Sequence, residues 1–114
     1  MELAERQRLQ KKELQKLNKI FKSVLDDDDY KKAETLIENA AFIRASLTEL
    51  RGDLMELGFV EHYQNGEHQS GLKDSSHLRA YNNLLKNYHT TIKLLLSIAP
   101  AAKAEVKDDG FDSF

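Results

Sequence analysis

The stretch "LIENAAFIRASLTELRGDLMEL", Leu36 to Leu57, decides the fold class, because its apolar residues recur at helical spacing. One series alternates intervals of four and three residues: Leu36, Ala40, Ile43, Leu47, Leu50, Leu54 and Leu57. This heptad pattern is typical of a helix that packs lengthwise against another helix. A second stripe lies beside the first and consists of Ala33, Ile37 and Ala41. The segment 30–57 is therefore expected to be a helix with two faces to cover.

The signals around this helix mark its ends. Four aspartates, Asp26 to Asp29, precede it, and Asp is a poor helix former that repels its like-charged neighbours. Asp28 or Asp29 also suits the start of a new helix, where a side-chain oxygen caps free N–H groups. Gly58 follows the last heptad position and suits a helix C-terminus.

A second heptad series lies further along the chain. Its members alternate intervals of three and four: Leu78, Tyr81, Leu85, Tyr88, Ile92 and Leu95. Ser75 or Ser76 can cap this helix, and Pro100 ends it. Two heptad helices joined by about seventeen residues can fold back as an antiparallel helical hairpin. The sequence predicts an all-α fold of three helices: a basic amphipathic helix at 1–25, a helical hairpin for oligomerisation at 26–100, and a flexible tail at 101–114.

The connection between the two heptad helices carries a turn signal. Asn65-Gly66 is the preferred pair of a type I′ turn, in which both residues need a positive φ. The sequence allows either a short β-hairpin or an ordered polar loop here. The four residues at its tip are also a possible docking point: Tyr63, Gln64, Asn65 and Gly66.

Composition limits the class of function. The chain has 114 residues, a net charge of −2 and no cysteine, which excludes disulfides, thiol catalysis and cysteine-based zinc sites. No apolar run approaches the roughly 20 residues that span a bilayer. We therefore expect no membrane association and a cytoplasmic location.

No pattern indicates catalysis or a cofactor. His62 and His68, with Glu61 and Glu67, have donor types that suit zinc, but no third ligand follows at a defined offset. Surface residues in a loop explain them better. No Gly-rich phosphate loop occurs, so we expect a non-enzyme without metal or cofactor.

Charge is distributed unevenly along the chain. Residues 1–25 hold seven Lys/Arg against three Glu, a net of +4, whereas residues 26–57 have a net of −5. The basic residues of the first segment are candidates for DNA contact: Arg6, Arg8, Lys11, Lys12, Lys16, Lys19 and Lys22. A solvated helix face is the alternative.

Residues 75–100 carry three basic residues and no acid, a net of +3. These residues, Arg79, Lys86 and Lys93, are seven apart and are expected to pair with acids across the helical hairpin. The two apolar faces of helix 30–57 favour association between chains, unless the first helix folds back and covers one of them.

Three stretches together resemble a known family. "LIENAAFIRASLTEL", "YQNGEHQSGLKDSS" and "AYNNLLKNYHTTIKLLLSIAP" are similar to small terminase subunits of phages and prophages of Gram-positive bacteria. The similarity covers roughly Ile20 to Pro100. The stretches 63–66 and 80–93 carry most of its specificity, because any coiled coil has heptads.

The resemblance implies a non-catalytic protein of phage DNA packaging. Such subunits form homo-oligomers, commonly rings, bind double-stranded phage DNA, and recruit the large subunit, which supplies ATPase and nuclease. This chain departs from the ring-forming members because no helix-turn-helix precedes the helical hairpin. A basic helix repeated around an oligomer can bind DNA backbone without reading bases. A protein-only helical adaptor or scaffold of phage assembly is the alternative.

Overall fold

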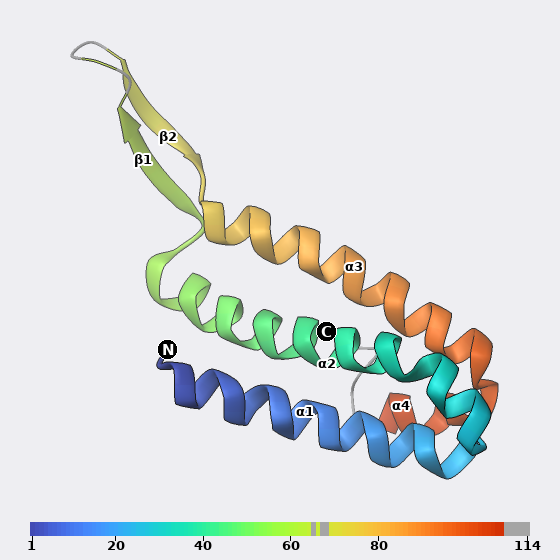
Figure 1. Cartoon of the computed structure of the whole chain (residues 1–114). Coiled ribbons are helices and arrows are strands. Elements are labelled where there is room, and N and C mark those ends of the chain that lie inside the picture. Colours follow the sequence, from blue (N-terminus) through green and yellow to red (C-terminus); the bar gives the residue numbers. More distant parts are fainter. Residues whose placement is uncertain (65, 67–68, 109–114) are drawn as a thin grey trace.

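Three long helices and one β-hairpin form the molecule (Figure 1). The structure is a computed structural model that describes residues 1–64, 66 and 69–108. Helices α1 (Leu3–Val24), α2 (Asp27–Leu57) and α3 (Ser76–Ile98) run alongside one another, and α2 packs against both of the others. Strands β1 (Val60–Gln64) and β2 (Ser70–Asp74) project beyond the helices. The molecule is accordingly elongated, with principal extents of 62 × 29 × 23 Å.

The helix ends follow from the residues that the sequence places there. Asp26 is the N-cap of α2, and its carboxylate accepts a hydrogen bond of 2.8 Å from the backbone N–H of Asp29. Ser75 caps α3 by accepting a bond of 2.9 Å from the N–H of Leu78. Gly58 ends α2 at a φ of +81°, which disfavours a side chain. The predicted break, the Ser75 cap and the Gly58 end are confirmed, whereas the N-cap of α2 is Asp26 and not Asp28 or Asp29 as predicted, because the helix begins at the first of the following aspartates.

The second stripe of α2 is covered within the chain. Ala33, Ile37 and Ala41 are buried, and they share one core with Leu17 and Phe21 of α1. Helix α1 thus packs on the second apolar face of α2, for which a partner chain was also considered (Figure 1). The stated alternative to association between chains, in which the first helix folds back and covers one face, is therefore what the structure has.

The heptad residues are buried to different degrees. Six are buried in the core: Ala40, Leu47, Leu54, Tyr88, Ile92 and Leu95. Another six are partly buried: Leu36, Ile43, Leu50, Leu78, Tyr81 and Leu85. Leu57 is 62% exposed, because it lies in the last turn of α2. The α2–α3 pairing therefore uses most of the predicted seam.

The connection between α2 and α3 is a β-hairpin, one of the two predicted alternatives. Its strands pair antiparallel, and Glu61 lies opposite Lys73 with 3.5 Å between Oε1 and Nζ. Tyr63 lies opposite Gly71, and its ring covers the space that a side chain at position 71 would need. Gly66 has a φ of +84°, as a tight turn requires, whereas Asn65 lies outside the described residues.

Two expectations about the C-terminal part need correction. A 3₁₀ turn, η1 (Pro100–Ala102), and a short helix, α4 (Lys103–Asp108), follow α3, so the described residues form four α-helices and a small sheet, whereas three helices were expected. Residues 101–108 were expected to belong to a flexible tail. Ala102 and Val106 are instead fully buried in the same core as Tyr88, and this burial offsets the entropy of ordering the segment.

Candidate functional site

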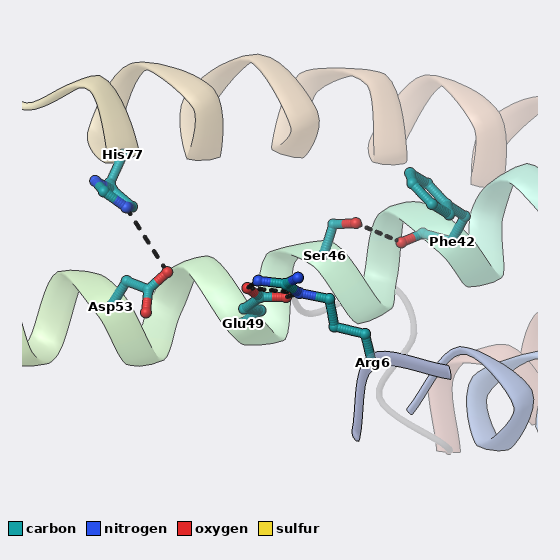
Figure 2. A network of polar contacts seen from close by, with 6 residues as sticks. All are labelled: Arg6, Phe42, Ser46, Glu49, Asp53 and His77. Carbon is teal, nitrogen blue, oxygen red and sulfur yellow. Dashed lines mark hydrogen bonds and ion pairs between the residues drawn. The ribbon is translucent and has the colours of Figure 1, made fainter. Parts of the chain in front are cut away.

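The seven basic residues predicted to contact DNA divide into those that have a partner inside the protein and those that do not. Arg6 belongs to the first group. Arg6 reaches across to α2, where its guanidinium donates to the Glu49 carboxylate at 2.9 Å from Nε and 3.0 Å from Nη2 (Figure 2). Such a two-bond contact holds an arginine in one orientation. Arg6 therefore joins α1 to α2 and is a poor candidate for a DNA contact.

The Arg6–Glu49 pair changes the ionisation of both partners. The hydrogen bond from Arg6 holds the pKa of the Glu49 carboxyl below its ordinary value, and burial opposes this effect. The same bond raises the pKa of Arg6. Glu49 therefore stays ionised at a lower pH than a solvated glutamate does.

A buried ion pair joins α1 to α2 further along. The Glu13 carboxylate accepts a hydrogen bond of 2.9 Å from Arg44 Nε, and Arg44 Nη1 donates to the Tyr88 hydroxyl at 3.3 Å. Glu13 is only 5% exposed, and Tyr88 is fully buried. The contact therefore ties all three long helices together at one level. Nothing in the sequence indicates this contact, because Glu13 looks like one charge of a solvated face.

Two lysines of α1 are partly engaged inside the protein. Lys16 Nζ lies 3.7 Å from the Glu13 carboxylate. Lys22 Nζ lies 5.1 Å from the centre of the Tyr30 ring, a distance that suits a cation–π contact. Both side chains are exposed enough to turn toward a ligand, although each would leave a contact to do so.

The other basic residues of α1 are exposed to solvent, although Lys11 also lines a groove between α1 and α2. Lys11, Lys12 and Lys19 are exposed, and no carboxylate of the described residues lies within 4 Å of their amino groups. Arg8 is exposed as well and makes only a long bond of 3.4 Å to the carbonyl of Ala4. At 100° per residue, Arg8, Lys12 and Lys19 lie within about 40° of one another around the axis. We call these four residues the α1 basic face.

The three basic residues of α3 do not pair across the helical hairpin as expected. Arg79, Lys86 and Lys93 are exposed, and no ion pair joins them to any described carboxylate. The acids considered as their partners are Glu38, Glu49, Asp53 and Glu56. Two of these have other contacts, since Glu49 pairs with Arg6 and Asp53 lies 3.8 Å from Nε2 of His77 (Figure 2). The predicted pairing is wrong because these residues lie on the face of α3 opposite its buried side, and therefore do not face α2.

The residues considered for metal binding stay apart in the described part of the chain. His62 is exposed on β1, opposite Leu72, and His68 and Glu67 lie outside the described residues. No group of three or more possible ligands comes together among residues 1–64, 66 and 69–108. His77 has one carboxylate neighbour, Asp53, which suits a helix–helix contact.

An apolar patch at the base of the β-hairpin is a feature that the heptad analysis missed. Met55 is 88% exposed and Leu72 is 70% exposed, and Phe59 and Val60 are more than half exposed. Met55 and Phe59 line a groove of about 400 Å³ together with Leu54, Leu78 and Tyr81, and with Arg51 and Asn82. Large apolar side chains that gather at one exposed site are typical of a binding surface.

The described helices include none with the length and apolar composition of a membrane span. The chain matches no family model, no curated protein and no solved structure. The resemblance to small terminase subunits therefore depends on the sequence motifs alone.

Proposed function

We propose that this protein is a small terminase subunit, a non-catalytic component of phage DNA packaging that binds double-stranded DNA and recruits a large ATPase and nuclease subunit. The observation that carries the DNA claim is the α1 basic face. Its lysines are exposed and have no described carboxylate partner, whereas a merely solvated helix commonly alternates its charges. Uncompensated cations on one face attract phosphates and release the counterions of DNA.

The arrangement supports binding to the DNA backbone without reading of bases. Lysine is a flexible point charge that contacts phosphate well but discriminates poorly among bases. The α1 helix is also fixed on the bundle through Arg6 and Glu13, so its basic face is held in one position. Several copies in one oligomer would add their weak contacts into useful avidity.

The apolar patch at the base of the β-hairpin supports association. Met55 and Phe59 are exposed and line one groove, and Val60 and Leu72 are exposed on the β-hairpin that follows. We propose that this patch forms contacts between copies in a homo-oligomer, for which a ring is one arrangement. The tip around Tyr63 and Gln64 then projects away from the helices and is available to the large subunit.

The same patch favours a second function, that of a protein-only adaptor in phage assembly. An adaptor of this kind would form oligomers and bind the packaging machinery without affinity for DNA. The two functions differ in one measurable property, which is salt-sensitive binding to duplex DNA.

The experiment is an electrophoretic mobility shift with duplex DNA at low and moderate salt. The variant K11E/K12E/K19E should lose the shift, because three attractive charges become repulsive. Reversal of Lys31, Lys32 and Lys107, which are exposed on other helices, is the charge-matched control and should weaken the shift far less. An unchanged shift for K11E/K12E/K19E, or no shift for the wild type at either salt, would remove the DNA claim and leave the adaptor.

A further inference from the structure

Helix α3 differs from the other described α-helices in having no acidic residue. Helix α3 contains Arg79, Lys86 and Lys93 and neither Asp nor Glu. Successive members are seven residues apart, and seven residues fall only about 20° short of two full turns. The three side chains therefore form a nearly straight line of about 21 Å.

This line faces away from the rest of the protein. Tyr88, Ile92 and Leu95 form the buried side of α3, and they lie roughly opposite Arg79 and Lys86 on the helix at 100° per residue. The line is exposed throughout, as are the neutral polar residues beside it: Asn82, Asn83, Thr90 and Ser97. The surface thus combines cations with neutral polar groups over several turns.

The carboxylates that could neutralise this line are committed to other contacts or lie elsewhere. Glu49 is held by Arg6, and Asp53 is directed toward His77. No carboxylate of the described residues lies within 4 Å of the charged groups of Arg79, Lys86 or Lys93. The charge of the line is therefore available to an external anion.

A groove continues the surface toward the C-terminal end of α3. It has a volume of about 470 Å³ and is lined by apolar side chains of Ile92, Leu96 and Pro100 and by Lys93, Lys103 and His89. Lys93 belongs to both the line and the groove, so the two are continuous. The groove therefore has apolar side chains between its two lysines. The lysines can contact phosphates, and the apolar side chains can contact the less polar sugars between those phosphates.

We propose that Arg79, Lys86, Lys93 and Lys103 form a second DNA-binding surface, which contacts the phosphate backbone of double-stranded DNA. A line of 21 Å parallels about six phosphates of one strand, at about 3.4 Å of helix axis per phosphate. The line itself contains no aromatic residue, whereas surfaces that bind proteins concentrate their affinity in buried aromatic and arginine anchors. An acidic polypeptide is therefore the less suitable ligand.

The inference rests on the proposed function for its choice of ligand, but it is separable from the α1 basic face. The α1 and α3 helices each pack against α2, and their exposed sides are different surfaces of the molecule. The α3 surface adds contacts at a distance from the first one. A duplex that meets both surfaces, in one copy or in neighbouring copies, is held with a fixed orientation.

The test measures fluorescence anisotropy of a labelled duplex across a series of salt concentrations. The variant R79Q/K86Q/K93Q should bind about tenfold more weakly near 0.1 M salt, and its slope of log K against log salt should fall by about two to three. The variant R79K/K86R/K93R keeps the charges and should bind within about twofold of the wild type. The control K31Q/K32Q/K107Q removes the same charge elsewhere and should keep the wild-type slope.

Three outcomes would overturn the proposal. If R79Q/K86Q/K93Q binds like the wild type while K11E/K12E/K19E does not, α3 plays no part and the proposed function stands. If the wild type binds no duplex at all, both proposals fail together. If poly-glutamate binds as tightly as duplex and the α3 variant weakens both equally, the surface is a site for acidic polypeptides. Circular dichroism of each variant establishes that the helices are intact.

Discussion

Glu13 of α1 and Arg44 of α2 form an ion pair with 2.9 Å between Oε2 and Nε, in a position where only 7% and 14% of the two side chains are exposed. Arg44 extends the contact to the hydroxyl of Tyr88 on α3. A buried charge that loses its partner keeps its desolvation cost without the attraction that compensated it. This pair therefore fixes how α1 lies on the other two helices.

Replacing Glu13 with Gln should destabilise the fold by about 3 kcal/mol, because a neutral amide does not compensate the charge of the largely buried Arg44 guanidinium as the carboxylate does. The measurement is the midpoint of urea unfolding followed by circular dichroism. The double variant E13L/R44M should recover much of the loss, since both charges are gone. K12Q, one residue away on the exposed side, should unfold like the wild type. An E13Q protein as stable as K12Q would show that the pair contributes nothing.

The Arg6–Glu49 contact predicts a pH dependence. Glu49 has a lowered pKa in the folded protein, so its contribution to stability is fully present above the ordinary value of 4.5 and is lost as pH falls through the folded pKa. R6Q removes the cause, so the pKa of Glu49 should rise toward 4.5. An NMR titration of the Glu49 side-chain carboxyl carbon measures this shift directly. The same pKa in R6Q and the wild type would mean that the contact does not persist in solution.

The C-terminal helix should contribute measurably to stability. Val106 is fully buried in the main core, although it follows the proline that ends α3 by only six residues. V106A removes two buried methyl groups and should cost on the order of 1–2 kcal/mol. K107A, the exposed neighbour, should have little effect in the same unfolding experiment. Equal stabilities of V106A and K107A would show that α4 does not dock.

The β-hairpin should respond to a methyl group at position 71. A β-carbon there would lie 3.1 Å from Cε1 and 3.3 Å from Cζ of Tyr63, closer than ordinary contact. G71A should displace the Tyr63 ring and change the cross-strand NMR contacts between Tyr63 and residue 71. In a Tyr63→Ala background, the same change should leave the remaining cross-strand contacts intact. A ring that keeps its position in G71A would show that the strands separate to make room.

The helices could be predicted because their signals are local. Asp26 and Ser75 cap their helices from neighbouring residues, and the heptad spacing of α2 and α3 is independent of the rest of the fold. The Asn-Gly pair likewise favoured a β-hairpin between them, although the strands Val60–Gln64 and Ser70–Asp74 alternate too weakly to exclude a loop.

The features that depend on distant contacts could not be read from the sequence. Val106 is buried because α4 returns to the core, and nothing near Val106 indicates that return. Arg6 and Glu13 look like charges of a solvated face until Glu49 and Arg44 are brought against them. The α3 cations are different, because counting 100° per residue from Tyr88, Ile92 and Leu95 places them opposite the seam from the sequence alone, whereas their spacing of seven by itself fits any face.

The central claim is that exposed cations of this protein bind duplex DNA through phosphates, and a salt titration tests it most directly. The affinity of the wild-type protein for a labelled duplex is measured by fluorescence anisotropy between 50 and 200 mM salt. With the α1 basic face and the α3 cations both in contact, affinity should fall at least about a hundredfold over that range. No binding at 50 mM salt, or an affinity that does not change with salt, would contradict the account.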